Sequence, residues 1–296
     1  MEIRVARVAD LEQAVALSNV VRPYAFGVRH RLERNLIERL GTDRHAAFAA
    51  EVDGQVVGWA TLSPADWLGM AHAFSLDLMV HPEYRRRGVG TRLLQACDEW
   101  LERLPSSFVQ SYADRAGTPF AVAAGFTAAE QLTYAGLELD DSLIAPPVPA
   151  GFTLVPISQL EAVDVYPAYR ATAADTPGMA GVDWPYEWFS NDLWKGELLD
   201  RDLSLALVRD GVVASFTLTD REGDRIWSDM TGTLAEYRGR GLAATVKLTS
   251  LAAARKSGAT HAYTIMNLTN APMLAINTRL GYRTVDLRTY VTRSRP

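Results

Sequence analysis

Two short stretches of this sequence combine arginine and glycine in a pattern that suits an anion. "RRRGVG" begins at Arg85 and "RGRGLA" begins at Arg238, and each leads into a segment with helical spacing of apolar residues. A helix N-terminus carries about half a unit of positive charge and exposes backbone N–H groups, so arginines beside it favour an anionic ligand. Glycines remove the Cβ atoms that would keep a phosphate from those N–H groups. We therefore predict a phosphate-binding turn in both places, with a solvated basic turn as the alternative.

Other phosphate-binding motifs fit these turns less well. A Walker loop needs Gly-Lys-Ser/Thr after a longer glycine spacing, and this sequence has none. "GRGLAA" from Gly239 satisfies the dinucleotide pattern G-x-G-x-x-A. It lies, however, in the middle of a domain after antiparallel hairpins, and a dinucleotide loop belongs to the first strand-to-helix turn of a parallel sheet.

The segments around the two turns repeat along the chain. Four landmarks recur in the same order with a nearly constant separation of about 150 residues. They are "VADLEQAV" from Val8 and "ISQLEAVD" from Ile157, "DGQVVGWATL" from Asp53 and "DGVVASFTL" from Asp210, "EYRRRGVG" from Glu83 and "EYRGRGLA" from Glu236, and "GF" at Gly125 and "GY" at Gly281. We predict a duplicated domain, an N-terminal copy over 1–142 and a C-terminal copy over 151–296, joined by the Pro-rich segment from Leu143.

Each copy reads as a short strand, an amphipathic helix, a hairpin, a further strand, and then the arginine-glycine turn and its helix. The Asp-Gly pairs at Asp53 and Asp210 favour the type I′ turn that joins antiparallel strands. The predicted fold class is therefore α/β (α+β), with two domains that each hold a mixed, largely antiparallel sheet flanked by helices.

These features resemble the GNAT acyltransferase superfamily, whose pyrophosphate loop reads R/Q-x-x-G-x-G/A. The resemblance covers essentially the whole chain as two GNAT domains in tandem, an arrangement similar to that of mycothiol synthases, and it implies acetyl-CoA as the acyl donor. A later family element, N-x-x followed by G-[FY], is clear in the second copy from Asn270 to Tyr282. In the first copy, from Asp114 to Phe126, this element is eroded.

The resemblance also implies which residues contact the cofactor. In the family, the loop holds the pyrophosphate, and the end of the preceding strand offers backbone N–H groups to the acyl carbonyl and the pantetheine. The implied residues are Leu78, Met79, Val80, Arg85, Arg86, Arg87, Gly88, Val89, Gly90 and Thr91 in the first copy, and Thr231, Gly232, Thr233, Arg238, Gly239, Arg240, Gly241, Leu242, Ala243 and Asn270 in the second. A second acyl-CoA in the N-terminal domain is part of this expectation.

Acyl transfer to an amine needs a neutral amine, a stabilised oxyanion and a proton for the leaving thiolate. Asp229 lies two residues before the implied acyl-binding strand end and could accept the amine proton, directly or through water; the structural alternative is that it neutralises an arginine or caps a turn. Many GNAT enzymes carry a tyrosine as general acid four residues before the final glycine. Asn277 and Ala121 hold those positions here, and only Asn277 could hydrogen-bond the cofactor or orient water. We expect the second copy to catalyse and the first to bind acyl-CoA without turnover.

A segment that differs from its counterpart in the first copy is the candidate acceptor site. Trp184 and Trp188 lie in "VDWPYEWFSNDLW", where aromatic and acidic residues alternate in a way that suits a cationic amine. The alternative is that these rings fill the core. Three functions remain open: N-acetylation of a small-molecule primary amine by direct attack in a ternary complex, non-catalytic acyl-CoA binding, and protein N-acetylation.

Composition limits the remaining possibilities. The chain has 296 residues, of which 48% are hydrophobic and 22% charged, as in an ordinary globular protein with room for two domains. A net charge of −5 argues against a nucleic-acid partner. The sequence has no run of about 18 apolar residues, the length that a membrane span needs. Its first residues also lack the apolar core of a signal peptide, so we expect a cytoplasmic protein with no membrane partner. With Cys97 the single cysteine and the histidines scattered, we expect no metal site.

Overall fold

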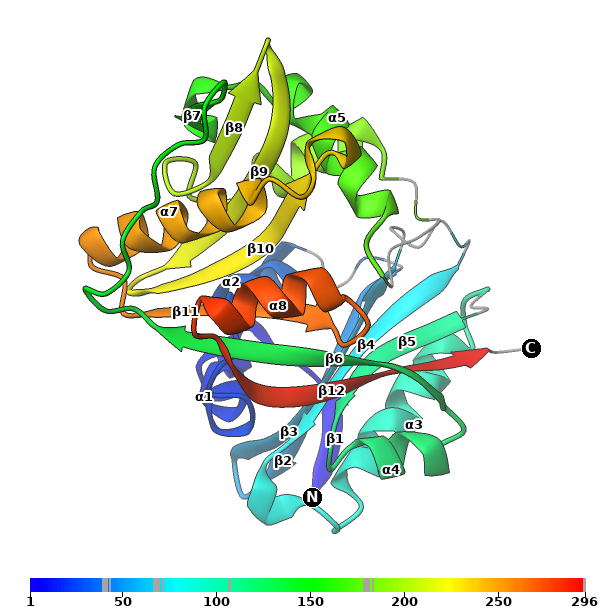
Figure 1. Ribbon diagram of the computed structural model, residues 1–296. Coiled ribbons are helices and arrows are strands. Elements are labelled where there is room, and N and C mark those ends of the chain that lie inside the picture. Colours follow the sequence, from blue (N-terminus) through cyan, green and yellow to red (C-terminus); the bar gives the residue numbers. More distant parts are fainter. Residues whose placement is uncertain are drawn as a thin grey trace. The chain divides into compact units, whose positions relative to one another are not determined.

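The structure, a computed structural model, describes all residues of the chain except 39–41, 43, 66–69, 71, 106–107, 178–181, 183 and 295–296. It divides into two compact units. Unit 1 comprises Met1–Glu130 and Arg288–Pro296, and unit 2 comprises Gln131–Leu287. Each unit holds a mixed, mostly antiparallel sheet flanked by helices, which confirms the predicted fold class (Figure 1).

Unit 1 has a sheet in the order β1-β2-β3-β4-β5-β12, in which only β4 and β5 run parallel. Its elements are β1 (Glu2–Val5), η1 (Val8–Asp10), α1 (Leu11–Val21), α2 (Val28–Glu33), η2 (Arg34–Glu38), β2 (Ala46–Val52), β3 (Gln55–Pro64), β4 (Ala73–Val80), η4 (Pro82–Tyr84), α3 (Val89–Leu101), β5 (Phe108–Asp114), α4 (Thr118–Ala123), the start of β6 (Thr127–Glu138) and the end of β12 (Arg283–Ser294).

The two faces of this sheet pack against different helices. Helices α1 and α2 cover one face, where Trp59 and Met79 are buried, and α3 covers the other, where Leu62 and Leu76 are buried (Figure 1). Because side chains alternate along a strand, neighbouring residues of β3 and β4 serve the two cores in turn.

Unit 2 repeats this plan with a sheet in the order β6-β11-β10-β9-β8-β7, in which only β10 and β11 run parallel. Its further elements are β7 (Thr153–Pro156), η5 (Ile157–Gln159), α5 (Ala162–Ala174), α6 (Tyr186–Trp188), η6 (Phe189–Leu193), β8 (Leu205–Arg209), β9 (Val212–Glu222), β10 (Arg225–Thr233), η7 (Ala235–Tyr237), α7 (Leu242–Lys256), β11 (His261–Asn267) and α8 (Ala271–Arg279). The hairpin turns of both units have positive φ at Asp and at Gly, which is the type I′ geometry expected.

The sixth strand of each sheet comes from the other half of the sequence. The last strand, β12, pairs with β5 from Arg288 to Ser294, and β6 pairs with β11 from Leu132 to Glu138. Unit 1 therefore takes the end of the chain, and unit 2 takes the residues that follow the first copy's Gly-Phe motif. The bounds 1–142 and 151–296 remain a prediction about the duplicated segments.

In both units the parallel pair of strands separates after three residue pairs. Pairing of β4 with β5 ends at Ser75 and Gln110, and pairing of β10 with β11 ends at Trp227 and Tyr263. Strand β10 also has a β-bulge, because the pairing with β9 shifts between Ser228 and Thr231. The pairing of β4 with β3 runs from Phe74 to Val80 with no such shift. A bulge at the open end of a strand pair re-aims side chains and frees backbone groups.

Candidate functional site

The two arginine-glycine turns have the same backbone conformation. Gly88 and Gly241, the residues before helices α3 and α7, have φ of 79° and 75°, a region that favours glycine. A Cβ built on either residue would meet no atom within 4 Å. The turn therefore requires glycine for its backbone, and the space above the glycine is open for a ligand.

Backbone N–H groups converge at both turns. Among the described residues, no acceptor is recorded for the amides of residues 86–91 in unit 1 or 239–244 in unit 2. The first intrahelical bonds are donated by Arg92 to Gly88 and by Thr245 to Gly241. Free donors at the positive end of a helix, with no Cβ in the way, fit a pyrophosphate group such as that of acetyl-CoA.

The first arginine of each turn holds the turn to its strand. The Nε of Arg85 donates to the carbonyl oxygen of Val80, and the Nε of Arg238 donates to that of Thr233, both at 3.1 Å. Arg238 also forms an ion pair of 2.7 Å with Asp175. These arginines therefore have a positioning role in the turn, in addition to any contact with an anion.

The arginine at the third position of each turn lies over the tyrosine three residues before it. Arg87 is 5.5 Å from the ring centre of Tyr84, and Arg240 is 5.6 Å from that of Tyr237. Cation–π contact keeps both guanidinium groups at the mouth of the turn.

Two residues implied as cofactor ligands have structural tasks. Gly90 lies inside α3, where an added Cβ would touch Phe120 at an ordinary 3.5 Å. Asn270 caps α8 by accepting a hydrogen bond of 3.3 Å from the Met273 amide. In unit 1, the counterpart Asp114 accepts a hydrogen bond of 2.6 Å from the amide of Gly117, the N-cap residue of α4, so it holds the turn before the helix without capping the helix itself.

A pair of carboxylates lies on the α5 face of the unit 2 sheet. Asp229 is on β10 at the bulge, and Asp220 on β9 is the register partner of Trp227. Asp229 retains exposed surface, but desolvation of its carboxyl group raises the pKa above its usual value, and a hydrogen bond from Trp227 opposes this. Desolvation and the charge of Asp229 together raise the pKa of Asp220 to about 7. Asp220 cannot be recognised from the sequence pattern, because its proximity to Asp229 depends on the strand register.

The corresponding carboxylate in unit 1 is neutralised. Asp77 of β4 forms an ion pair of 2.7 Å with Arg22, which follows α1. Burial raises the pKa of Asp77, but the charges of Arg22 and Arg31 outweigh it and bring the pKa below its usual value. Asp77 is therefore ionised at neutral pH and paired, so it is poorly placed to accept a proton.

The aromatic residues of 182–194 divide between core and surface. Trp184 and Phe189 are buried at 6% and 0% exposure, so for them the core alternative describes the structure. Trp188 is half-buried, with its ring 4.4 Å from that of Trp184 and 6.5 Å from that of Tyr169. The charge of Asp229 helps to raise the pKa of Tyr169, after desolvation, so this aromatic group adjoins the carboxylate pair. Asp183 lies outside the described residues.

Asn277 is buried at 2% exposure in α8. Its Nδ2 donates to the sulfur of Met266 at 3.2 Å, and its Oδ1 has no hydrogen-bond donor among the described residues. A buried acceptor without a donor is costly unless a ligand or water supplies one.

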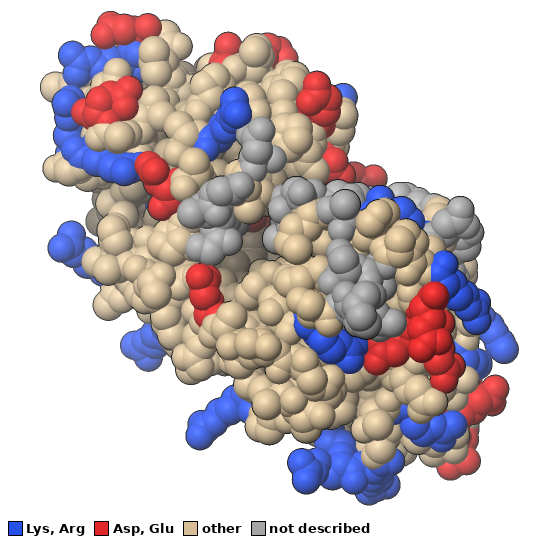
Figure 2. Space-filling view, turned by 90° about the vertical axis from the view of Figure 1, so that its right-hand side faces the viewer, with Lys and Arg blue, Asp and Glu red and all other residues tan. Residues whose placement is uncertain are grey.

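Other features of the surface lie apart from these residues. A groove of about 1190 Å³ in unit 1 is lined by β1, β2 and the far part of α3, and includes none of the predicted site residues. Acidic and basic side chains are interspersed over the face drawn in Figure 2. Within the described residues, no group of three His, Cys, Asp or Glu side chains could hold a metal ion. Helices that are long and apolar enough to cross a membrane are absent from the same part of the chain.

Comparison with known proteins finds a matching family, a related sequence and similar structures among acetyltransferases. Residues 14–126 match the acetyltransferase (GNAT) family. An N-alpha-acetyltransferase from Sulfurisphaera tokodaii is 33% identical over 108 residues, which are 32% of this chain and 58% of that protein, so the chain spans little more than half of that relative. A GCN5-related N-acetyltransferase from Sphaerobacter thermophilus has a TM-score of 0.78 at 20% identity and covers 100% of this chain and 96% of its own. A tandem GNAT protein from the clavulanic acid biosynthesis pathway has a TM-score of 0.74 at 21% identity, over 99% and 98% of the two chains.

Proposed function

We propose that the chain is an acetyl-CoA-dependent N-acetyltransferase of the GNAT family, because residues 14–126 match that family and the fold is similar to that of tandem GNAT proteins. One observation carries the cofactor part of the proposal. In both units a left-handed glycine opens a helix whose first amides have no acceptor among the described residues, which is the arrangement that a pyrophosphate needs.

We place catalysis in unit 2. Its strand β10 has a bulge at the open end, and Asp229 at that bulge lies beside a second carboxylate, with no arginine of the described residues acting on its pKa. In unit 1 the corresponding strand is regular, and Asp77 is paired with Arg22. Unit 1 retains the turn, so it binds an acyl-CoA without turnover.

The residues of unit 2 then have distinct roles. Acetyl-CoA supplies an activated acetyl thioester. The amides of Thr231 and Thr233, which alternate with that of Gly232 and face away from β9, donate to the acyl carbonyl oxygen, where negative charge develops. The acceptor nitrogen forms its bond to the carbonyl carbon, and the proton lost by the amine passes to Asp229. The carbon–sulfur bond breaks, and coenzyme A leaves as the thiolate, which takes up a proton from water. Asn277 orients the cofactor or a water molecule through its unpaired Oδ1.

The acceptor is a small molecule with a primary amine. Support comes from the acidic pair, Asp220 and Asp229, which attracts an ammonium group, and from the half-buried ring of Trp188 near it. The name of the Sulfurisphaera relative favours a second candidate, the N-terminal amine of a protein.

A competition between acceptors tests the proposal. The purified full chain is incubated with acetyl-CoA and either small diamines and aromatic amines or peptides with free N-termini, and products are identified by a mass gain of one acetyl group. Small-molecule products at the higher kcat/KM support the first candidate, and peptide products support the second. Binding of acetyl-CoA with no product in either set would make the chain a non-catalytic acyl-CoA-binding protein.

A further inference from the structure

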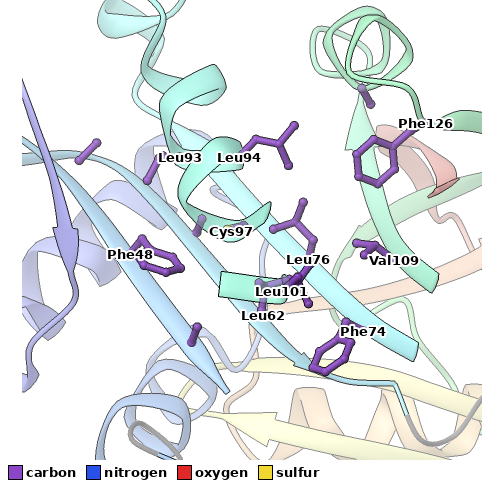
Figure 3. Close-up of a cluster of buried hydrophobic side chains, with 14 of the residues drawn as sticks. Phe48, Leu62, Phe74, Leu76, Leu93, Leu94, Cys97, Leu101, Val109 and Phe126 are labelled. Carbon is purple, nitrogen blue, oxygen red and sulfur yellow. The ribbon is translucent and has the colours of Figure 1, made fainter. Parts of the chain in front are cut away.

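The side chains between the sheet and its long helix are apolar in unit 1. Beneath α3 lie Leu62 and Leu76 from the sheet, Leu94 and Cys97 from the helix, and Phe126 from the segment after α4, all at 7% exposure or less (Figure 3). Ala121 of α4 belongs to the same core. This layer is an ordinary hydrophobic core.

The corresponding layer of unit 2 has polar side chains at six of these positions. Pairing the repeated motifs and strand registers matches Leu62, Leu76, Leu94, Cys97, Ala121 and Phe126 with Thr219, Ser228, Lys247, Ser250, Asn277 and Tyr282. All six residues of unit 2 are buried. The fold does not demand this polarity, because unit 1 builds the same core from apolar side chains.

Lys247 is the charged member of this layer. It is 2% exposed, and among the described residues it has no recorded hydrogen bond or ion pair. Its Nζ lies 5.0 Å from the ring centre of Tyr282. Burial lowers the pKa of Lys247 to about 7, and no charged group adds to this effect. An amine held in this way changes its charge near neutral pH.

A chain of contacts connects Lys247 to the open end of β10. The hydroxyl of Tyr282 lies 3.2 Å from the Oγ of Ser228, and Ser228 is the last paired residue before the bulge. The carbonyl oxygen of Ser228 accepts a hydrogen bond of 2.9 Å from Thr264 of β11. Lys247 is therefore two side chains away from the place where the strands separate.

Among the described groups that face α7, Tyr282 is the titratable side chain that contacts Lys247. Residues on the same face of the sheet are apolar or carry hydroxyls, namely Leu207, Ala214, Thr217, Thr219, Ile226 and Ser228. From α8 and β11 come Asn277, Met266 and Thr264. Burial raises the pKa of Tyr282, so its phenol stays neutral and leaves the lysine as the group that changes charge.

Burying an amine without an anionic partner destabilises a protein, and a residue that carries this cost without need from the fold has a functional reason. We propose that Lys247 is a positioning residue of unit 2, whose ammonium form places a positive charge behind β10 and, through Tyr282 and Ser228, favours the negative charge that develops on the acyl oxygen and the thiolate during transfer. This inference rests on the proposed function. Acyl transfer is then expected to slow as the pH rises through the pKa of Lys247, because the ammonium group loses its charge.

The charge can be measured without turnover. The chain has three lysines, Lys195, Lys247 and Lys256, so side-chain NMR of lysine-labelled protein resolves each titration, and Lys247→Met assigns the signal. We expect Lys247 to titrate near neutrality in the free protein and at least half a pH unit higher with coenzyme A bound. Binding of coenzyme A with no shift would refute this inference alone, whereas no binding at all would refute the proposed function.

Kinetics provide the second test, with acetyl-CoA as donor and spermidine or tyramine as acceptor. We expect Lys247→Met to lower kcat at least tenfold below pH 7, to change the KM for acetyl-CoA little, and to remove the alkaline fall in kcat. Lys247→Arg, charged at every pH, should retain activity above pH 8. Ser250→Cys, which copies the unit 1 residue one turn away, is the matched control and should keep the wild-type profile. If Lys247→Met keeps the wild-type kcat and the wild-type alkaline fall in kcat, the proposed role of Lys247 is wrong. If neither amine is acetylated, the change in the Lys247 titration on coenzyme A binding, measured by NMR, tests that role instead.

Discussion

The carboxylate of Asp77 lies 2.7 Å from the guanidinium of Arg22, whereas the residue that corresponds to Asp77 in unit 2, Asp229, lies beside a second carboxylate. The two environments move the carboxyl pKa values in opposite directions, down for Asp77 and up for Asp229. One strand position thus holds a fixed negative charge in unit 1 and, in unit 2, a carboxyl group whose raised pKa makes it a better proton acceptor than an ordinary aspartate.

The first prediction concerns the proton acceptor. Asp229→Asn should lower kcat by about 10²–10⁴, the range for loss of a general base, while acetyl-CoA binding persists. Steady-state kinetics and calorimetry measure the two effects. Asp77→Asn is the matched control in unit 1 and should leave kcat near the wild-type value. Equal losses of kcat in the two variants would contradict the proposal that only unit 2 catalyses the reaction.

The second prediction concerns the acidic limb of the pH profile. Because the pKa of Asp229 is raised, its ionised form appears at a higher pH than that of an ordinary aspartate, and the acidic limb of kcat/KM should be displaced upwards in the same direction. Asp220→Asn removes a like charge next to Asp229 and should shift this limb to lower pH. A limb that does not move would show that the two carboxyl groups do not interact.

The third prediction concerns stability. The pKa of Asp77 is lower in the folded protein than in the unfolded chain, so the ion pair with Arg22 stabilises the fold above the unfolded pKa of the carboxyl group. This stabilisation is lost as the pH falls through the lower, folded pKa. Asp77→Asn should therefore reduce the free energy of unfolding at pH 7 and have little effect in strong acid. Urea unfolding at several pH values measures the difference, and a constant difference would contradict the linkage.

The sequence predicts some parts of this molecule well because they depend on local backbone chemistry. The Asp53-Gly54 turn and the left-handed Gly241 follow from which residues tolerate positive φ. The pairing of β12 with β5 does not follow, because strands with similar alternation could each fill the sixth place in a sheet. The sequence does not predict the proximity of Asp220 to Asp229 for a related reason, since this proximity depends on a strand register that the bulge shifts. The contrast between Lys247 and Leu94 is visible in the aligned repeats, but it acquires meaning only when burial is known.

The final prediction tests both acyl-CoA sites. Gly241→Val places a branched side chain at φ 75°, in the open space over the amides of unit 2, and Gly88→Val does the same at φ 79° in unit 1. We expect calorimetry to give two acetyl-CoA molecules per wild-type chain and one in each variant. Activity should be lost with Gly241→Val and largely kept with Gly88→Val.

A control separates loss of the ligand site from backbone strain. Gly223, in the turn between β9 and β10, also has a positive φ, 62°, and open space at its Cβ, but it lies outside the arginine-glycine turn. Gly223→Val should carry similar strain and still bind two acetyl-CoA molecules. If it loses binding as Gly241→Val does, the loss reflects strain and the turn is not shown to hold the cofactor. If Gly88→Val abolishes activity and Gly241→Val does not, the chemistry belongs to unit 1, and the roles proposed for Asp229 and Lys247 fail together.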